Sequence, residues 1–389
     1  MKVLFVKSST TLFGGGSKSF MNMLDGLMKL GVQPLVVFPG ADGMCELYRN
    51  RGIPTAVMNY RMAVYPPLRY WKDYVMFLPR LCGRILVNYI SLCKLREIVK
   101  LFQPDIIHTN VSVIDIGYRV AMQLKIPHIY HVREYGDKDF SLFHYPMRSC
   151  FLKKLKKHSY AICITKDIQK HYNLNVDNSC VIYNGVCSET QIRFSPHKKN
   201  YFLFAGRLEP AKGVGELLIA FADFCLLRPN LDIRLKIAGD TKDIRYYDFL
   251  LNEVKRLHIE GRVDFLGMRK DINDLMTDAY LMIVPSKFEG FGRITAEAMQ
   301  NGALVLGRDT AGTKEQFDNG LEMTGEEIAL RYSTCQELVK KMCEVVDNGI
   351  EHYFPMIERS QQVVRNLYTN EYHAQHVYDF YNEILTIKK

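Results

Sequence analysis

The chain has 389 residues, 48% of them hydrophobic, which suits two globular domains and excludes a disordered protein. Its ten cysteines form no Cys-x-x-Cys pair and no zinc spacing, and its apolar start is too short for a secretory signal, so a cytoplasmic setting is expected. Arg80 and Arg84 interrupt the best candidate for a membrane-spanning helix.

The net charge of +9 is unevenly distributed along the chain. Residues 1–200 contain 28 Lys and Arg against 13 Asp and Glu, whereas residues 201–389 contain 23 against 29. The two halves therefore differ electrostatically, and the first half should be drawn to an anionic partner.

The first half of the chain alternates buried-looking apolar runs with helical patterns. This alternation predicts an open parallel sheet with helices on both faces. Ligands of such sheets bind beyond the carboxyl ends of the strands, so polar residues at those ends are candidate site residues. The predicted strands are residues 2–6, 34–38, 105–108, 128–131, 161–166 and 181–186.

Three glycines, at residues 14–16, separate the first predicted strand from an amphipathic helix. The sequence is not a Walker loop, because Ser17 stands where that loop has a glycine before its lysine, Lys18 here. The glycines either form a flexible turn or let a phosphate or acceptor approach the helix N-terminus. Gly15 and Gly16 are therefore candidate donor-binding residues.

The segment 61–100 combines positive charge with aromatic side chains. Helical spacing predicts an apolar stripe on one side, with Arg80, Arg84 and Asn88 opposite. The stripe is expected to pack on the sheet of the first domain, which leaves the basic face free to lie on anionic lipid, where each Lys or Arg contributes about 1 kcal/mol. The stripe consists of Leu81, Cys82, Ile85, Leu86, Tyr89 and Cys93. The basic residues are Arg61, Arg69, Lys72, Arg80, Arg84, Lys94, Arg96 and Lys100.

Two clusters of polar residues follow predicted strands of the first half. One comprises residues 108–110 and the other residues 131–137. A histidine in such a place is either structural or a group that transfers protons. Asn110 cannot titrate near neutral pH, which leaves His131 and Glu134 as candidates for proton transfer.

The region 188–200 is polar and makes a plausible hinge. A second alternation of strands and helices follows it, and residues 371–385 form an amphipathic helix near the end of the chain. The strands expected in this half are residues 201–206, 233–239, 263–267, 280–284 and 303–307.

A loop after the strand at 201–206 carries Arg207 and Lys212, five residues apart and bounded by glycines. Two cations in such a loop can clamp a diphosphate from two sides. The alternative is a pair of solvated basic residues on the surface.

A glycine turn after the strand at 280–284 is framed by Glu289 and Glu297. The turn consists of Gly290, Phe291 and Gly292, and the helix that follows points unpaired amides outward. Eight helical residues would span about 12 Å, too far for joint attack on one bond, so the carboxylates suit two ends of one elongated ligand. The alternative is a surface turn with two solvated acids.

These motifs resemble those of the family 4 retaining glycosyltransferases, which have the two-domain GT-B fold. The turn matches the Glu-x7-Glu signature of that family, and the resemblance implies that Glu289 contacts the transferred sugar and Glu297 the ribose. It likewise implies that Arg207 and Lys212, in a Gly-Arg-x4-Lys-Gly element, bind the donor diphosphate. The resemblance covers nearly the whole chain but is specific only in residues 201–316.

The same resemblance extends to weaker features of the chain. In the family, a glycine-rich loop such as that at Gly15 and Gly16 faces the inter-domain cleft, and Thr313 and Lys314 would lie near the donor sugar. Many members have a His-x-His where this chain has Asn110 as the second residue. A final helix crosses back onto the first domain.

The resemblance implies two Rossmann-like α/β domains facing across a cleft. They are expected at residues 1–190, on the acceptor side, and 191–370, which would bind the nucleotide sugar, with residues 371–389 crossing back. The expected activity is retaining transfer of a sugar from a nucleoside-diphosphate donor to a hydroxyl acceptor, in bacterial cell-surface polysaccharide or glycolipid synthesis. No metal cofactor is expected, and no nucleic acid.

Two other functions stay open at the level of sequence. A sugar-nucleotide epimerase on the same fold would process a donor without an acceptor. A catalytically silent binding protein would keep only the nucleotide pocket. Product analysis separates these functions from glycosyl transfer.

Overall fold

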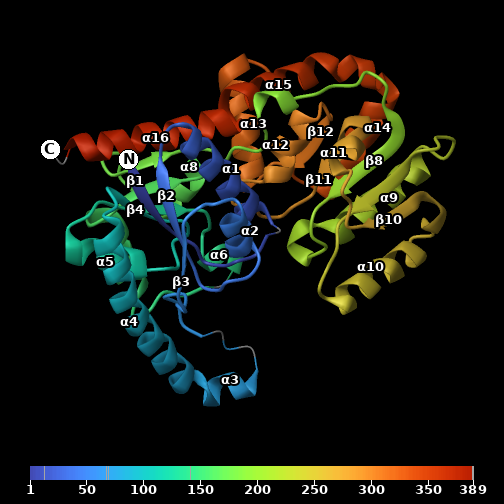
Figure 1. Cartoon of the computed structure of the whole chain (residues 1–389). Helices are drawn as coiled ribbons and strands as arrows, with labels where there is room; N and C mark the ends of the chain where they lie inside the picture. The colour runs from blue at the N-terminus through green and yellow to red at the C-terminus, as the bar shows by residue number, and fades with distance from the viewer. Residues whose placement is uncertain (13, 67, 69, 141, 388–389) are drawn as a thin grey trace. The chain divides into compact units, whose positions relative to one another are not determined.

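The computed structural model describes residues 1–12, 14–66, 68, 70–140 and 142–387, and the chain divides into two compact units. Unit 1 consists of Met1–Gly185 and Asn370–Lys389, and unit 2 of Val186–Thr369. Each unit contains one parallel sheet with helices against it (Figure 1). The predicted α/β class is thus confirmed. The chain passes between the units at 185/186 and 369/370, where the sequence predicted 190/191 and 370/371.

Unit 1 is built on a seven-stranded sheet with the order β3-β2-β1-β4-β5-β6-β7. The central strand β1 (Lys2–Val6) pairs in parallel with β2 (Gln33–Phe38) and β4 (Ile106–Thr109). Successive side chains of β1 enter different cores, because a strand alternates the faces that it presents. The other strands are β3 Thr55–Val57, β5 His128–Val132, β6 Tyr160–Cys163 and β7 Ser179–Val181.

Helices cover both faces of this sheet. One core gathers α1 and α16 over Val3 and Phe5, and the other gathers α4 and α5 over Leu4 and Val6. The helices of unit 1 are α1 Gly15–Lys29, α2 Met44–Asn50, α3 Trp71–Val75, α4 Phe77–Phe102, α5 Ile116–Leu124, α6 Asp137–Phe140, α7 Arg148–Lys157, α8 Lys166–His171 and α16 Asn370–Ile387.

The last helix, α16, is part of unit 1 and packs along α1. The two backbones approach closely at Gly26, where an added Cβ would lie 2.3 Å from the Cβ of Ala374. Val377 and Tyr381 are wholly buried on this side. The Tyr381 hydroxyl also reaches Nδ1 of His108, at 2.6 Å, so α16 contacts the carboxyl edge of the sheet.

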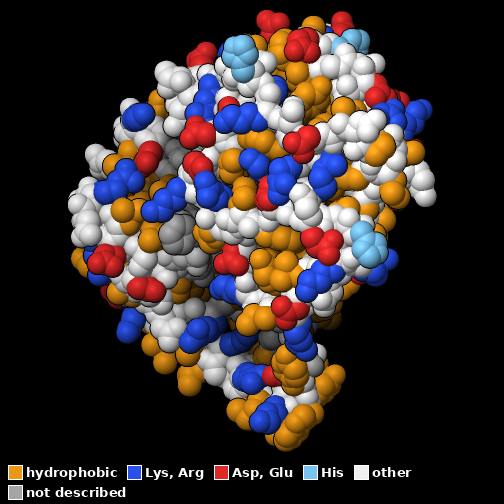
Figure 2. All heavy atoms as spheres, turned by 90° about the vertical axis from the view of Figure 1, so that its right-hand side faces the viewer, with side chains coloured by type: hydrophobic (Ala, Val, Ile, Leu, Met, Phe, Trp, Pro, Cys, Tyr) orange, Lys and Arg blue, Asp and Glu red, His pale blue; other side chains and the backbone are white. Residues whose placement is uncertain are grey.

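Helix α4 does not pack as the sequence predicted. It extends away from the sheet of unit 1, with α3 at its far end (Figure 1), and that end carries hydrophobic and basic side chains on its surface (Figure 2). Ile85, Leu86 and Tyr89 are exposed, whereas Asn88 is buried. The expectation that the apolar stripe covers the sheet is therefore wrong. Asn88 is instead held inward by hydrogen bonds with the backbone of Arg61, which lies 27 positions earlier in the chain.

Unit 2 contains a six-stranded parallel sheet with the order β10-β9-β8-β11-β12-β13. Its strands are β8 Lys199–Ala205, β9 Arg234–Ala238, β10 Val263–Gly267, β11 Ala279–Val284, β12 Val305–Arg308 and β13 Leu330–Tyr332. Its helices are α9 Val214–Leu227, α10 Ile244–Arg256, α11 Ile272–Asp278, α12 Arg293–Gln300, α13 Ala311–Thr324, α14 Cys335–Asn348 and α15 Phe354–Leu367. Short 3-10 turns are η1 Glu189–Gln191, η2 Pro210–Lys212, η3 Glu260–Arg262 and η4 Ile350–Tyr353.

The strand order of unit 2 changes direction between β8 and β11, which pair in parallel. The chain leaves β8 toward one side of the sheet and leaves β11 toward the other. Loops at such a switch point diverge and leave a crevice where ligands bind in this class of fold. Residues 206–213 follow β8 and residues 285–292 follow β11, so both predicted donor motifs start at this point.

Candidate functional site

The two loops at the switch point of unit 2 are fitted to each other through their backbones. The amide of Lys287 donates to the carbonyl of Ala211, at 2.9 Å. Gly213 has φ of 74°, and a Cβ there would lie 2.2 Å from the carbonyl oxygen of Pro285. Only glycine combines this conformation with so close an approach. The contact fixes the side chains of the first loop relative to those of the second.

Lys212 and Glu289 form an ion pair across these loops, although they are 77 positions apart in the chain. The distance from Nζ to Oε1 is 2.5 Å, and the side chains are 17% and 18% exposed. Salt screens a partly buried ion pair less than a fully exposed one. Two residues that the sequence assigned to the diphosphate and to the sugar thus lie together at one point.

Arg207, the other predicted cation, is held differently. Its Nη1 atom donates to Oε1 of Glu209 at 2.8 Å, and its side chain is 68% exposed. Both residues lie in the same loop, so this pair links no other element. An exposed pair contributes little to stability, which leaves the guanidinium able to exchange Glu209 for a stronger anion.

The glycine turn forms the N-terminus of α12. Gly292, with φ of 77°, is its N-cap residue, and the amide of Gly312 donates to the carbonyl of Glu289 at 3.0 Å. The amide group of Gln316 donates to the carbonyls of Phe291 and Gly292. The turn is thereby fixed to the start of α13.

The predicted donor-binding residues of the turn differ in what they present. Phe291 is buried and its ring packs edge to face with Tyr368, at 5.5 Å between centroids, so its ring belongs to the core. Gly290 precedes it in the turn and Gly292 follows it, directly before α12. A ligand at this turn would therefore meet backbone groups rather than the aromatic ring.

Glu297 and Thr313 lie close to the same turn. One carboxylate oxygen of Glu297 accepts from Nη2 of Arg293 at 3.0 Å, on the first turns of α12. Thr313 is buried, with its hydroxyl 3.5 Å from that of Thr295 and 3.2 Å from the position of a Cβ on Gly292. Thr313 thus packs against the turn.

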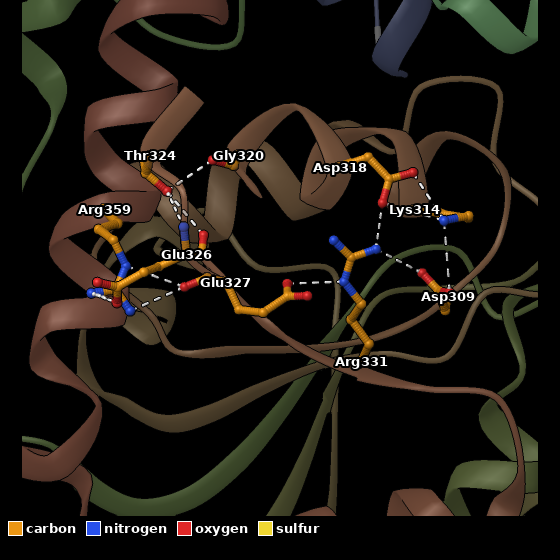
Figure 3. A network of polar contacts seen from close by, with 9 residues as sticks. All are labelled: Asp309, Lys314, Asp318, Gly320, Thr324, Glu326, Glu327, Arg331 and Arg359. Carbon is orange, nitrogen blue, oxygen red and sulfur yellow. Dashed lines mark hydrogen bonds and ion pairs between the residues drawn. The ribbon is translucent and has the colours of Figure 1, made fainter. Parts of the chain in front are cut away.

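An ion network holds α13 against β13 (Figure 3). Nη1 of Arg331 donates to Asp318 at 2.6 Å and to Asp309 at 3.1 Å. Burial opposes the ionisation of Asp318, but hydrogen bonds from Arg331 and Lys314 outweigh it and hold the pKa of the carboxyl below its ordinary value. Lys314, which the sequence placed near the sugar, is thus engaged with Asp318.

The glycine-rich loop of unit 1 forms the turn before α1. Helix α1 begins at Gly15, Gly14 is its N-cap with φ of 117°, and the loop is exposed. A Cβ on Gly14 or Gly16 would have no atom within 4 Å. The start of this 15-residue helix is thus open to an approaching ligand.

His131 lies near the carboxyl end of β5 in the sheet of unit 1 and is wholly buried. Its Nδ1 atom is 3.2 Å from Nε2 of His108 and 3.3 Å from Nη2 of Arg133. Burial, followed by the charge of Arg133, holds the pKa of His131 well below its ordinary value, so the ring is neutral at pH 7. Nε2 of His131 has no hydrogen-bond partner among the residues that the structure describes.

Arg133 organises this edge of unit 1. Its Nε atom donates to Asn110 at 3.1 Å, and its Nη1 atom donates to Asn184 at 2.6 Å. Asn110 thus accepts a hydrogen bond from the Arg133 guanidinium. Glu134 is buried and accepts from the amide and hydroxyl of Ser112, at 2.8 and 2.7 Å, which gives it a structural role.

Lys7 is a residue of this edge that the sequence analysis missed. It directly follows β1 and is buried, with its Nζ atom 4.4 Å from the centroid of the Phe20 ring. Burial, together with the charge of Arg133, lowers the pKa of Lys7 to about 7. A lysine directly after a buried central strand is the signal that could have identified it.

We expect Lys7→Met to stabilise the chain in a pH-dependent way. The folded pKa of Lys7 lies below the unfolded value of about 10.4, so between these pH values the unfolded chain binds more protons and wild-type stability rises with pH. The cost of charging Lys7 is about 1.4 kcal/mol per unit of pKa difference, and it is fully present below pH 7. The variant should therefore be the more stable protein near pH 6.5, with an advantage that shrinks toward pH 10.

Urea unfolding of both proteins across this pH range measures that advantage. Lys29→Met, at the exposed end of α1, is the matched control and should change stability little. An advantage that is absent at pH 6.5, or that does not depend on pH, would contradict the assignment.

Comparison with known proteins identifies the family of both units. Residues 13–190 match Glycosyltransferase Family 4, and residues 188–363 match Glycosyl transferases group 1. An uncharacterized glycosyltransferase of Methanocaldococcus jannaschii is 27% identical over 250 residues, 63% of this chain and 66% of that protein. The matched stretch thus spans just under two thirds of that relative.

A second relative matches over a longer stretch. The UDP-Gal:alpha-D-GlcNAc-diphosphoundecaprenol alpha-1,3-galactosyltransferase of Escherichia coli is 26% identical over 349 residues, 78% of this chain and 86% of that protein.

Solved structures agree with these matches. The structure of HepE from Anabaena, in complex with UDP, superimposes with a TM-score of 0.77 over 98% of this chain and 100% of that one, at 19% identity. A likeness at this level of identity shows the fold, which is GT-B, as predicted. The two family matches adjoin and together extend over residues 13–363. The chain therefore belongs to the family 4 glycosyltransferases of the GT-B fold.

Proposed function

We propose that this chain transfers a sugar, with retention of configuration, from a nucleoside-diphosphate sugar to a hydroxyl acceptor. The observation that carries the proposal is the Lys212–Glu289 ion pair, at 2.5 Å, at the switch point of unit 2. It brings a phosphate-binding cation and a carboxylate together beside the N-terminus of α12. In a nucleotide sugar the diphosphate lies next to the sugar, so the cation would meet the diphosphate and the carboxylate would meet the sugar.

In this proposal the diphosphate lies on the amides around Gly290 and Gly292, between Lys212 and Arg207. Helix amides and cations both favour phosphate oxygens. Arg207 would exchange Glu209 for the diphosphate, since that pair is exposed. Glu297 would bind the ribose hydroxyls, and in unit 1 the amides of Gly15 and Gly16 at the α1 N-terminus would be offered to a phosphate or to the acceptor.

The proposed chemistry is electrostatic. The bond from the anomeric carbon to the diphosphate oxygen breaks, its electron pair leaves with the diphosphate, and the acceptor oxygen bonds to the anomeric carbon. With retention, leaving group and acceptor share one face of the sugar, so the departing diphosphate is the nearest base for the acceptor proton. Lys212 and the amides stabilise the diphosphate, and the Glu289 carboxylate orients and stabilises the positively charged sugar.

His131 enters this proposal as a neutral group. Its pKa lies well below the ordinary value, so its ring does not supply a positive charge at neutral pH. Its contacts to His108 and Arg133 suit a role in positioning the carboxyl edge of unit 1. We propose that this unit binds the acceptor.

The substrates of relatives suggest a donor and an acceptor class. The HepE structures contain UDP and, in one case, UDP-glucose, and the E. coli relative is named for transfer of galactose from UDP to a sugar on diphosphoundecaprenol. We propose a uridine-diphosphate hexose as donor and a lipid-linked glycan as acceptor, in cell-surface polysaccharide or glycolipid synthesis.

Turnover should survive a chelator. The proposal gives the diphosphate charge to Lys212, Arg207 and the helix amides. Among residues 1–12, 14–66, 68, 70–140 and 142–387, no group of three His, Cys, Asp or Glu side chains is arranged to hold a metal ion. Initial rates measured with excess EDTA and with added magnesium should agree within about twofold. Loss of turnover in EDTA that magnesium restores would assign the diphosphate charge to a metal.

A panel of nucleotide sugars tests the proposed function. A ligand that binds only the folded chain raises its melting temperature, which identifies the donor. Chromatography of the products then separates the candidate functions. Transfer to an acceptor supports the proposal, a changed nucleotide sugar without acceptor indicates an epimerase, and binding without reaction indicates a silent protein.

A further inference from the structure

Exposed hydrophobic side chains concentrate in one short part of unit 1. Of the thirty large hydrophobic side chains that are exposed among the described residues, ten lie between residues 70 and 90. A soluble surface normally scatters such residues singly, and a contiguous group marks an interaction site. The ten residues are Tyr70, Trp71, Tyr74, Val75, Met76, Leu78, Ile85, Leu86, Tyr89 and Ile90, and we name them the apolar patch.

The first half of α4 has its polar side toward the protein. Nη1 of Arg84 donates to the carbonyl of Val64 at 2.8 Å, Asn88 exchanges two hydrogen bonds with the backbone of Arg61, and the Ser91 hydroxyl donates to the carbonyl of Asn59. A helix on the surface of a soluble protein ordinarily has its apolar side toward the protein and its polar side toward solvent. These contacts hold the helix in this orientation, so the exposure of the apolar patch is built into the fold.

The second half of α4 is arranged in the ordinary way. Leu92, Leu95 and Val99 are buried against the sheet, while Lys94 and Lys100 are exposed. The reversed orientation is therefore confined to the part of α4 that extends away from the sheet of unit 1 (Figure 1). The side chains of the apolar patch are exposed, and no described residue of unit 1 covers them, as is typical of a surface that docks on a partner.

The charges around the apolar patch favour an anionic surface. Lys72 and Lys94 are exposed, and Asp73, the acid nearest to Lys72, is paired with Arg80 at 2.5 Å. Tyr and Trp beside Lys and Arg are the side chains that favour the boundary between lipid headgroups and acyl chains. Figure 2 shows blue basic groups among the orange ones at this end of the molecule.

We propose that residues 70–90 dock on an anionic membrane surface, with the apolar patch at the boundary between headgroups and acyl chains. No helix among the described residues has the length and apolar character to cross a bilayer, and this contact requires none. The apolar patch enters the lipid and the lysines contact its headgroups, whereas the sequence suggested a basic face alone. The proposal stands apart from the donor chemistry of unit 2.

Trp71 makes the test direct, because it is the single tryptophan of the chain and lies in the apolar patch. Its fluorescence should shift to shorter wavelength with vesicles of phosphatidylcholine and phosphatidylglycerol, and lipids brominated in their acyl chains should quench it. Vesicles of phosphatidylcholine alone should give neither effect. Salt should release the protein, because screening weakens the attraction.

Two sets of variants separate the contributions to docking. Leu86→Gln with Ile90→Gln should lower the affinity for anionic vesicles at least tenfold, and Lys72→Gln with Lys94→Gln should remove most of its salt dependence. Leu226→Gln with Leu227→Gln, on the exposed end of α9 in unit 2, is the matched control and should bind vesicles as wild type does. Arg84 stays unchanged because it bonds to Val64, and Arg69 lies outside the described residues.

Three results would overturn the proposal. They are no vesicle binding at low salt, equal binding to neutral vesicles, and concentration-dependent self-association that shifts the Trp71 emission without lipid. The last would assign the apolar patch to a second copy of the chain. Donor affinity should be unchanged in every variant, which shows that unit 2 is folded and keeps this test independent of the proposed function.

Discussion

The Glu289→Gln variant is expected to turn over about 100-fold more slowly than the wild type, with nearly unchanged affinity for the donor. Glutamine keeps the size of the side chain and can still accept a hydrogen bond from Lys212, whose Nζ atom now lies 2.5 Å from Glu289. It removes the charge that stabilises the sugar as its bond to the diphosphate breaks. Because that charge matters most in the transition state, the loss should fall on kcat rather than on KM.

Steady-state rates of donor consumption, with calorimetry of the nucleoside diphosphate, measure the two effects separately. Glu253→Gln is the matched control, because Glu253 is also paired with a cation of unit 2, Arg256, but lies on α10. The control should stay within about twofold of the wild type, because Glu253 pairs within α10 and has no part in the proposed reaction. Equal turnover of Glu289→Gln and wild type would remove Glu289 from the reaction.

The Lys212→Ala variant is expected to bind the nucleoside diphosphate about 10- to 150-fold more weakly than the wild type. This is the equivalent of about 1.5–3 kcal/mol for a hydrogen bond to a charged group. The variant also leaves Glu289 without its cation beside the diphosphate. Arg207→Ala should cost less, because the Arg207 side chain is 68% exposed and must be ordered on binding.

A double variant measures how much of the lost affinity for the nucleoside diphosphate comes from the unpaired carboxylate of Glu289. Lys212→Ala with Glu289→Gln should recover some of the lost affinity, because the unpaired carboxylate is removed. Lys340→Ala, on the exposed side of α14, is the control and should leave affinity unchanged. Affinity equal to wild type for Lys212→Ala would place the diphosphate elsewhere.

The strands in the interior of the two sheets could be predicted because they are buried on both sides. The run at residues 280–284, for example, corresponds to β11, Ala279–Val284. The edge strands β3 and β13 were missed, since each has three residues and pairs on one side only. The strand predicted at residues 181–186 corresponds to β7, Ser179–Val181, which ends five residues earlier than expected. The carbonyl of Tyr183 lies outside the strand and accepts a hydrogen bond from His373.

The orientation of α4 could not be predicted from spacing. Periodicity shows that a helix has an apolar side, but it does not show which side meets the protein. Here the backbone of residues 59–64 decides it, by binding Arg84, Asn88 and Ser91. Those partners are more than 15 positions away in the chain, so no local pattern includes them.

The residues of the candidate donor site could be predicted from the sequence, but the ion pair between Lys212 and Glu289 could not. Arg207, Lys212 and Glu289 each follow a strand, and adjacent parallel strands bring such loops together. Which cation would meet Glu289 depended on the contact between Gly213 and Pro285, which spacing does not reveal. In unit 1, the contact of His108 with Tyr381 joins residues 273 positions apart.

The anomeric configuration of the sugar released from the donor distinguishes retaining transfer from inverting transfer. Proton NMR during slow hydrolysis of the identified nucleoside-diphosphate sugar, recorded before the free sugar equilibrates, shows which anomer forms first. We predict the configuration of the donor, with release that falls about 100-fold in Glu289→Gln. Release of the opposite anomer would contradict retaining transfer at this site.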